Sequence, residues 1–552
     1  MTDAFTRRRF VEVATVAAAT PLLGALGSAG HAGLAPIDAL LPLRVWDAMA
    51  DDLLEITIQR LQSLYDNQTY TASQVTRWYL DRVARYDPVY RAVWHVDAAG
   101  ALATAARLDG EAKRHRRGSA TRGALWGVPI VTKANTSVRG LVTSTGWYGY
   151  VVPGRELIAP RDATIVAKLK AAGAIIVGQT NMPDFAASDT NFSTAFGRTG
   201  NAYNPRYSPG GSSGGAVTAV TANFCVFGNG TDTGNSIRMP ASTSNVVGFL
   251  PTRGLVSIAG IHPLDWLRDN TGPIARTVTD AAIALDVMAG EDAADFRTQG
   301  SALDAQPRPY TRFLQRDALR GKRFGVPSFI VNGESGSRLE PDTRALFMKA
   351  VDELKAAGAT VVFDASILPD SFEALTSQIN TQPYAAEGVE DFLREFGPPY
   401  YHSSLEYAKT IGAPIPLVRG AGIPSNPVRR IETDPQAAAM VWQPQRSALA
   451  EFDQTLDRFH LDGYVYPAAQ MPPNDEIAPL LEGGRSSGPH SKTAWVNPLG
   501  VPAVSMPAGF YENGLPFGLE ISTRRWKDGD LLGWAFAYEQ ATGHRRPPKL
   551  GD

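Results

Sequence analysis

Two stretches decide how this sequence is interpreted: Ser208-Pro209-Gly210-Gly211-Ser212-Ser213-Gly214-Gly215 and Gly228-Asn229-Gly230-Thr231-Asp232-Thr233-Gly234-Asn235-Ser236-Ile237-Arg238. The first leads into a small-residue helix predicted at 216–223, and its glycines leave a backbone whose amides can approach a ligand closely. The second follows a short apolar strand predicted at 224–227. A glycine-rich loop that ends on serine can present consecutive N–H groups toward one point, which is what an oxyanion hole requires.

Each stretch also has other interpretations. Gly211-Ser212-Ser213-Gly214-Gly215 satisfies G-x-S-x-G, the nucleophile elbow of α/β-hydrolases, with Ser213 as nucleophile. That elbow follows directly on a strand, and Pro205 and Pro209 argue against one here. A serine at a helix start can also serve only as a cap. For the second stretch a phosphate-binding loop is the rival, but neither G-x-x-x-x-G-K-[ST] nor G-x-G-x-x-G is formed.

A lysine stands upstream of both stretches. The segment Leu125-Trp126-Gly127-Val128-Pro129-Ile130-Val131-Thr132-Lys133 predicts a buried strand that ends in this lysine. Burial disfavours the charged form and lowers the pKa of a lysine, so that Lys133 can act as a base near neutral pH. Taken alone the feature is weak, because most lysines at strand ends reach solvent.

Helix and strand patterns alternate along the rest of the chain. We expect helices at 48–65, 71–86, 97–117, 162–172, 279–289 and 531–542, and further strands at 174–178 and 323–327. This alternation predicts an α/β domain with a central, mostly buried sheet. Residues 290–470 are more polar and richer in proline, and 411–427 predict a surface excursion. Residues 495–540 return to strand, turn and helix, so we expect the C-terminus to rejoin the sheet.

The composition indicates a large globular enzyme. The chain has 552 residues, of which 44% are hydrophobic, enough to bury a core without a disulfide or a metal. Its 53 Lys and Arg nearly balance 55 Asp and Glu, which argues against a nucleic-acid partner. The single cysteine, Cys225, excludes an intramolecular disulfide and a multi-cysteine metal site. None of the eight histidines has a metal-binding spacing, so we expect no metal and no cofactor.

Residues 1–32 predict an export signal. Thr6-Arg7-Arg8-Arg9-Phe10-Val11 is a basic head, a short apolar run follows, and Gly30-His31-Ala32 is a small-residue exit. The arginine pair resembles a twin-arginine signal, so we expect a protein exported already folded, to the periplasm or outside the cell. A frayed amphipathic terminus is the alternative. The apolar run is too short to span a bilayer and no later segment reaches about 18 apolar residues, so we expect no stable membrane anchor.

Taken together, Lys133 and the two serine stretches, with Ser212 standing 24 residues before Ser236, resemble the amidase signature family. The resemblance implies an α/β amidase signature fold, in which helices cover both faces of a central mixed β-sheet. It also implies one amidase domain over 33–552, with a core at about 47–289 and 495–540. The region at about 290–470 would then lie on the substrate side.

In that family a Ser–cis-Ser–Lys triad does the chemistry. The resemblance makes Ser236 the nucleophile, Ser212 the bridging serine after a cis peptide, and Lys133 the base. It assigns three further groups of residues: oxyanion-hole backbone N–H groups at Thr233, Gly234, Asn235 and Ser236; supporting side chains at Ser213, Asp232 and Arg238; and substrate contacts around Asp184, Phe185 and Ala186.

Two positions depart from the family pattern. Glycine commonly precedes the nucleophile, and here Asn235 does, a residue that tolerates unusual φ and whose side chain can narrow or polarise the pocket. Ala134 follows Lys133 where aspartate is common, which removes a supporting contact and leaves the triad intact.

The resulting expectation is an exported serine amidohydrolase that acts on a small or medium, partly apolar amide, such as an aryl or alkyl amide. Esters and carbamates would be side substrates, since acyl-enzyme chemistry is shared. The alternatives are the glutaminase component of a tRNA-dependent amidotransferase, a binding protein without activity, and an α/β-hydrolase esterase. The oligomeric state is open, and a homodimer is allowed.

Overall fold

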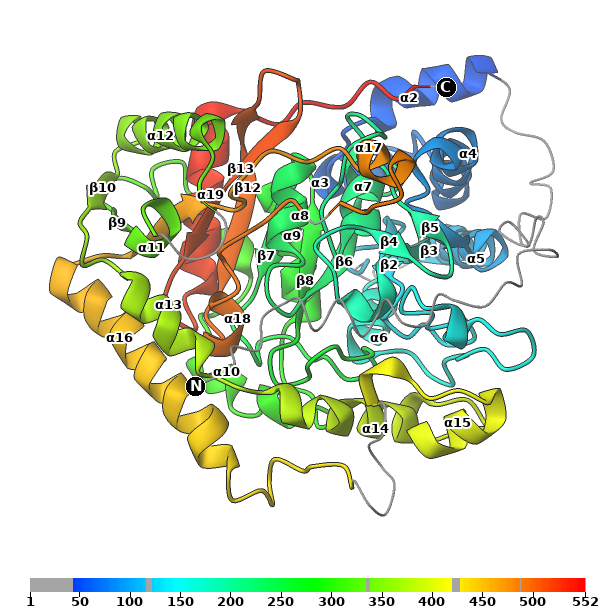
Figure 1. Ribbon diagram of the computed structural model, residues 1–552. Helices are drawn as coiled ribbons and strands as arrows, with labels where there is room; N and C mark the ends of the chain where they lie inside the picture. The colour runs from blue at the N-terminus through cyan, green and yellow to red at the C-terminus, as the bar shows by residue number, and fades with distance from the viewer. Residues whose placement is uncertain (1–42, 116–121, 334–337, 419–426, 487, 552) are drawn as a thin grey trace.

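The computed structural model describes residues 43–551 except 116–121, 334–337, 419–426 and 487. The predicted export signal at 1–32 and part of the predicted excursion at 411–427 lie outside the described residues. Within them an 11-stranded sheet runs through the centre of the molecule, in the order β1-β3-β2-β6-β8-β7-β12-β13-β11-β9-β10 (Figure 1). Its pairs are both parallel and antiparallel, so the sheet is mixed.

The strands of this sheet come from the whole length of the described chain. Residues 290–470 supply its last three members, and the C-terminal hairpin lies in its interior, which confirms that the C-terminus rejoins the sheet. The strands are β1 (Val93–Val96), β2 (Pro129–Lys133), β3 (Ile175–Thr180), β6 (Phe227–Asp232), β7 (Val247–Leu250), β8 (Asn270–Ala275), β9 (Arg323–Val326), β10 (Thr360–Phe363), β11 (Gly463–Pro467), β12 (Ala503–Phe510) and β13 (Pro516–Ser522). A separate two-stranded sheet pairs β4 (Phe192–Ser193) with β5 (Gly197–Arg198).

Helices cover both faces of the central sheet, as the resemblance implied (Figure 1). The α7–α8 pair packs on β6, β7 and β12. In a second group, α6 contacts α9, α9 contacts α19 and α19 contacts α12, and α9 and α19 also pack on the sheet. The longer helices are α2 (Leu43–Leu53), α3 (Ile58–Asp66), α4 (Ala72–Tyr90), α5 (Ala98–His115), α6 (Thr164–Ala171), α7 (Gly214–Thr221), α8 (Arg238–Thr243), α9 (Val278–Met288), α12 (Pro341–Ala356), α13 (Asp370–Ser377), α14 (Ala385–Phe396), α15 (Ser404–Ile411), α16 (Gln443–Phe459) and α19 (Asp528–Thr542). Four short ones are α10 (Ser301–Asp304), α11 (Ser328–Val331), α17 (Ile477–Leu481) and α18 (Val496–Leu499).

Two local predictions are wrong. The helix expected at 48–65 is two helices, α2 and α3, because Glu55 adopts a left-handed φ of 56° and Thr57 caps the second helix by accepting from the Arg60 N–H. The strand expected at 224–227 begins only at Phe227 and continues through the glycines into Asp232. Much of the second glycine-rich stretch is therefore a buried strand.

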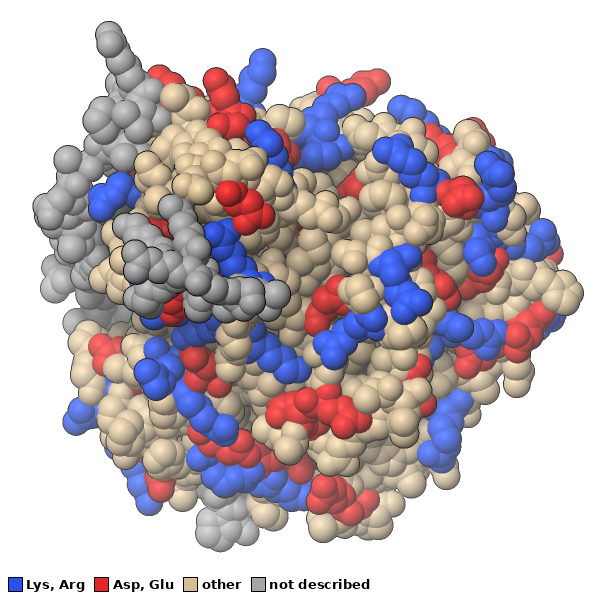
Figure 2. Space-filling view, turned by 180° about the vertical axis from the view of Figure 1, so that it is seen from behind, with Lys and Arg blue, Asp and Glu red and all other residues tan. Residues whose placement is uncertain are grey.

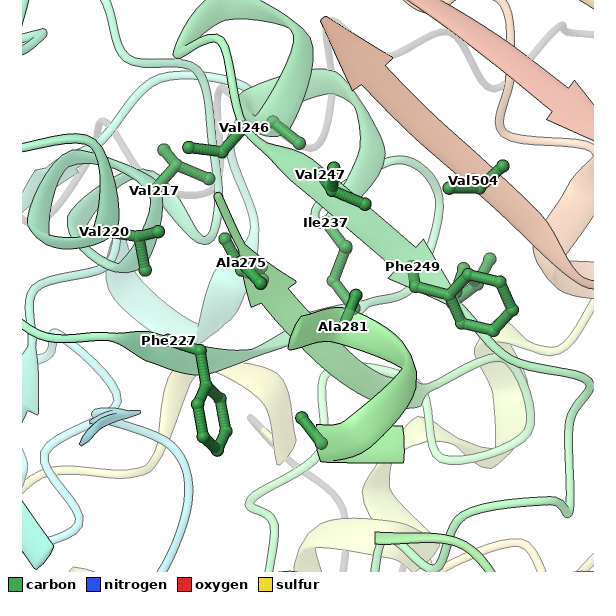
Figure 3. Close-up of a cluster of buried hydrophobic side chains, with 14 of the residues drawn as sticks. Val217, Val220, Phe227, Ile237, Val246, Val247, Phe249, Ala275, Ala281 and Val504 are labelled. Atoms are coloured by element: carbon green, nitrogen blue, oxygen red, sulfur yellow. The ribbon is translucent and has the colours of Figure 1, made fainter. Parts of the chain in front are cut away.

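Apolar side chains anchor this strand and the turn after it. Figure 3 shows Ile237 in a cluster of buried side chains that includes Val217 and Val220 of α7, Val247 and Phe249 of β7, and Ala281 of α9. Ile237 directly follows Ser236 in the chain. Full burial of such a side chain contributes about 1.5–3 kcal/mol, so the core holds the chain immediately after the candidate nucleophile.

The surface carries both signs of charge. On the face in Figure 2, Lys and Arg alternate with Asp and Glu, and no large field of one sign stands out. This agrees with the balanced composition. Among the described helices none is both long and apolar enough to cross a membrane.

Candidate active site

Lys133 ends β2, between β3 and β6, with no exposed surface. Its Nζ donates to Ser212 Oγ at 2.7 Å, to Ser213 Oγ at 2.9 Å and to the Thr231 carbonyl at 3.3 Å. Burial lowers the pKa of Lys133 to about 7, although the nearby carboxylates of Asp232 and Asp269 raise it. The lysine therefore sits near the midpoint between its charged and neutral forms at neutral pH.

The serine loop, which we define as residues 210–215, brings two hydroxyls to this lysine. Its Gly211–Ser212 peptide is cis, as the resemblance implied, and both Ser212 and Ser213 are fully buried. Ser213 Oγ also lies 3.2 Å from the Thr231 carbonyl, which accepts its hydrogen bond. No strand occurs between Arg198 and α7 in this described part of the chain, so the arrangement of an α/β-hydrolase elbow is absent.

The glycines of the serine loop make room for another part of the protein rather than for a ligand. A Cβ on Gly211 would lie 2.5 Å from the Thr190 carbonyl oxygen and 2.7 Å from that of Ser188. A Cβ on Gly214 would lie 2.6 Å from Asn191 Cβ, and one on Gly215 would meet the backbone of Asn181. The expectation of close ligand approach is therefore replaced by close packing of the segment 181–191.

The nucleophile loop, which we define as residues 233–236, is held residue by residue. The Thr233 hydroxyl donates to Asp269 Oδ1 at 2.5 Å, and the Gly234 carbonyl accepts from Arg238 Nη2 at 2.7 Å. The Asn235 amide donates to Asp189 Oδ1 at 3.2 Å. The Ser236 carbonyl accepts from the Ser213 N–H at 3.2 Å, which joins the two loops. Asn235 and Ser236 are each 6% exposed, whereas the serines beside Lys133 are fully enclosed.

Arg238 is the centre of a buried polar network. Its guanidinium lies 3.2 Å from Asp232 Oδ2 and 2.5 Å from Glu520 Oε1, and none of the three side chains is exposed. It also donates to Asn497 Oδ1 at 2.8 Å, and the Asn497 amide donates to the Asp232 carbonyl at 2.8 Å. The Tyr466 hydroxyl donates to Glu520 Oε1 at 2.9 Å. The C-terminal part of the sheet thus supports the nucleophile loop.

In this network, burial and the charged partners shift the pKa values of Glu520 and Arg238 in opposite directions. Burial raises the pKa of Glu520 to about 7, against the lowering effect of Arg238, while the two carboxylates hold the pKa of Arg238 above its usual range despite its burial. Sequence reasoning identified Asp232 and Arg238 and missed Glu520 and Asn497. The available indication was a lone glutamate inside the apolar strand 516–522, since an acidic residue is almost never fully buried unless it is paired.

The segment expected to contact substrate lies beside the lysine. Phe185 and Ala186 both have left-handed φ, of 54° and 63°. Ala186 packs with Ala134, the residue after Lys133, and Phe185 belongs to an aromatic cluster with Trp147. The third member, Asp184, accepts from the Thr194 N–H at 2.8 Å within its own segment. Burial raises the pKa of Asp184 to about 6.

Part of the region 290–470 packs against the segment that contains Phe185. Val389 and Phe392 of α14 and Tyr407 of α15 pack in the cluster that holds Phe185. These helices lie along one edge of the molecule in Figure 1. A role of the region in substrate contact stays a prediction. In the described part of the chain no group of three His, Cys, Asp or Glu side chains could hold a metal ion.

Known proteins resemble this chain over the region that contains Lys133, Ser212 and Ser236. The Amidase family model matches residues 74–532. The A subunit of the glutamyl-tRNA(Gln) amidotransferase from Thermosynechococcus vestitus is 33% identical over 510 residues, which cover 89% of this chain and 99% of that relative. A similar match, 32% identical, comes from the protein of the same name in Moorella thermoacetica.

Solved structures share the fold. The native peptide amidase of Stenotrophomonas maltophilia superimposes with a TM-score of 0.74 at 28% identity and covers 90% of this chain and 99% of its own. The A subunit of the glutamyl-tRNA(Gln) amidotransferase from Thermotoga maritima gives 0.66 at 25% identity, with 91% and 99% covered. The family model spans the lysine strand, the serine loop, the nucleophile loop and the C-terminal hairpin. The chain belongs to the Amidase family, and this confirms the resemblance to amidase signature enzymes.

Proposed function

We propose that this protein hydrolyses a carboxylic amide through an acyl-enzyme on Ser236, with Ser212 as the bridging serine and Lys133 as the base. The observation that carries the proposal is the bond of 2.7 Å from Lys133 Nζ to Ser212 Oγ, inside a fully buried site. With a pKa of about 7, Lys133 has a populated neutral form that can take a proton from serine.

The proposed reaction is a proton relay through these three residues. Neutral Lys133 takes the proton of Ser212, Ser212 takes that of Ser236, and Ser236 Oγ forms a bond to the amide carbonyl carbon. Collapse of the tetrahedral intermediate breaks the C–N bond, and Ser212 returns a proton to the departing amine. Water then attacks the ester on Ser236 by the same relay and releases the carboxylic acid. Every proton is returned, and no cofactor enters.

The nucleophile loop supplies the oxyanion site in this proposal. Backbone N–H groups of Thr233, Gly234, Asn235 and Ser236 would face the charged oxygen. Donors that are held in place before the reaction cost no reorganisation in the transition state. The partners of this loop described above provide that hold, and the Ile237 N–H closes its turn on Asp232 Oδ2 at 2.8 Å.

Two substrate classes remain, and they have different support. The curated relatives, which are A subunits of glutamyl-tRNA(Gln) amidotransferases at 30–33% identity, favour the side-chain amide of glutamine, with ammonia passed to an acceptor. The structural comparison gives a higher TM-score with a peptide amidase than with such an amidotransferase chain, 0.74 against 0.66, which favours a free-standing hydrolase of other amides. Both use the same proposed chemistry at Ser236.

The test measures hydrolysis of an aryl anilide, L-glutamine, a C-terminal peptide amide and a p-nitrophenyl ester by the purified protein. Ser236→Ala and Lys133→Ala should each lower kcat by about 10³-fold or more on every substrate that turns over. Ser213→Ala should retain more activity, since its hydroxyl supports Lys133 and the Thr231 backbone but is not a member of the proposed relay. The triad assignment is overturned if Ser236→Ala turns over at the wild-type rate or if Ser213→Ala alone is inactive.

The same panel separates the two substrate classes. Ammonia release from L-glutamine well above that from the peptide amide and the anilide supports the glutaminase component of an amidotransferase. The opposite order supports the free-standing amidohydrolase with ester side activity. If Ser236→Ala abolishes hydrolysis of every substrate in the panel, the measured activities belong to this site and not to a contaminating enzyme.

Export by the twin-arginine route is part of the proposal for the free-standing enzyme. Its support is the sequence Thr6-Arg7-Arg8-Arg9-Phe10 followed by a short apolar run. Residues 1–32 fused to a reporter that is active only after export should carry it out of the cytoplasm. The pair Arg7→Lys and Arg8→Lys should stop this transport, and unchanged transport would contradict the route.

A further inference from the structure

Among the four partners of the nucleophile loop, that of Asn235 is different. Thr233, Gly234 and Ser236 are held by Asp269, Arg238 and the Ser213 N–H, all of which are buried. Asn235 is held by Asp189, a half-buried residue 46 positions earlier in the chain. This bond therefore lies at the outer side of the site.

The segment that carries Asp189 is fixed in place. The Ser188 hydroxyl accepts from the Thr190 N–H at 3.1 Å, which closes a tight turn around Asp189. The carbonyls on either side of Asp189 lie directly against Gly211, so closely that no Cβ fits there. Asp189 thus extends from a backbone that already packs on the cis peptide of Ser212. Its carboxylate links the serine loop to the nucleophile loop.

The bond between Asn235 and Asp189 also helps to orient the Asn235 backbone N–H. The peptide between Gly234 and Asn235 is planar, so its N–H points away from the Gly234 carbonyl that Arg238 holds. Arg238 sets the plane of this peptide from one side, and the Asn235 side chain tethers the next Cα from the other. Together they determine where the Asn235 N–H, one of the proposed oxyanion donors, is directed.

We propose that Asp189 is a positioning residue for the reaction. It acts through the Asn235 side chain to hold the Asn235 N–H toward the developing oxyanion. It also keeps the nucleophile loop in a fixed position relative to the serine loop. This rests on the proposed function, because it assumes that the loop stabilises a tetrahedral intermediate. Its effect falls on the transition state and leaves binding of the uncharged amide unchanged.

The experiment compares Asp189→Ala, Asp189→Asn, Asn235→Ala and the double variant Asp189→Ala/Asn235→Ala on the best amide substrate. Asp189→Ala should lower kcat about tenfold, the size expected when one charge-assisted hydrogen bond is lost, with KM within twofold. Asp189→Asn keeps an acceptor for the Asn235 amide and should restore most of kcat. The double variant should be no slower than the slower single variant, because both remove the same contact.

Controls separate this result from misfolding and from failure of the proposed function. Asp162→Ala removes another half-buried carboxylate and should leave kcat unchanged, because its partners, Lys170 at 2.7 Å and the Arg139 N–H at 2.8 Å, belong to neither loop. The positioning role is overturned if Asp189→Ala has wild-type kcat, if Asp189→Asn is as slow as Asp189→Ala, or if the two single effects multiply. If Ser236→Ala is active, the proposed function fails instead, whatever the Asp189 variants do.

Discussion

The serine loop and the nucleophile loop carry similar residues and are held by different means. The serine loop is held by close packing, and its Gly211, Gly214 and Gly215 leave no space for a side chain beside the segment 181–191. The nucleophile loop is held mainly by hydrogen bonds to side chains, with one backbone bond from the Ser213 N–H. Its Gly234 has room, because a Cβ there would lie 3.6 Å from Ala494 Cβ, an ordinary contact. Glycine thus has a packing reason in one loop that is absent in the other.

The difference matches the two tasks in the proposed reaction. A lysine that must lose its proton near neutral pH needs a dry surrounding, and rigid backbone packing around Ser212 and Ser213 provides one. The nucleophile must remain reachable, and Ser236 keeps a small exposed area. A loop at such an opening cannot be buried on all sides, so it depends on directed hydrogen bonds.

The strongest way to break the side-chain-held loop is to remove its buried support. Glu520→Ala takes one carboxylate from Arg238 and leaves the Tyr466 hydroxyl without its acceptor, so we expect a loss of about 3 kcal/mol in the free energy of unfolding. Arg238 should then hold the Gly234 carbonyl less firmly, and kcat should fall together with stability. Denaturant unfolding and steady-state kinetics measure the two effects.

Glu520→Gln is the matched control, since it keeps the shape and one acceptor without the charge. The folded-state pKa of Glu520, about 7, is above its ordinary value of 4.5. Stability tied to its proton is therefore present at low pH and lost as pH rises through about 7. The wild type should accordingly lose stability relative to Glu520→Gln over this range. Equal pH dependence of the two proteins would contradict a buried, proton-binding Glu520.

The backbone-held loop is broken by a single methyl group. Gly211→Ala places a Cβ against the carbonyl oxygens of Ser188 and Thr190, and neither is the end of a flexible side chain. We expect a loss of about 1–3 kcal/mol in unfolding free energy and a lower kcat, because Ser212 must move with the strained backbone. Thermal unfolding with parallel kinetics tests this.

Gly234→Ala is the counterpart in the other loop. Its Cβ would make an ordinary contact with Ala494 Cβ at 3.6 Å, and the Gly234 backbone lies outside the left-handed region. We expect a change in stability within about 0.5 kcal/mol. If the two alanine variants were equally destabilised, the distinction between a packed loop and a tethered loop would not hold.

Sequence reasoning predicted the parts of this site that lie in local patterns. The strand that ends in Lys133 and the helix after Ser213 follow from apolar runs and small residues, and the structure confirms both. The family resemblance supplied the cis peptide before Ser212, which no pattern in a single chain encodes. The catalytic roles of Lys133, Ser212 and Ser236 stay predictions until activity is measured.

Sequence reasoning did not predict the contacts between segments that are far apart in the chain. Glu520 bonds to Arg238 across 282 positions and Asn497 across 259. The lone glutamate in an apolar strand indicates a buried pair, but nothing near either residue identifies Arg238 as the partner. Asp189 meets Asn235 only because the turn at 188–190 packs on Gly211. The sequence pattern predicts a strand at 224–227, too early in the chain, because glycine-rich sequence favours a loop. Pairing of β6 with β2 on one side and β8 on the other overrides that preference.

The last prediction concerns the buried base beside the serine loop, the titration of Lys133. If its neutral form is the base, kcat/KM should rise with pH to a midpoint near 7 and fall about tenfold for each pH unit below it. Asp269 raises the pKa of Lys133, so Asp269→Asn, which can still accept from Thr233, should move this midpoint to lower pH. A rate that stays flat from pH 5 to 8 in the wild type, or a midpoint that Asp269→Asn leaves in place, would mean that deprotonation of Lys133 does not control the reactivity of Ser236.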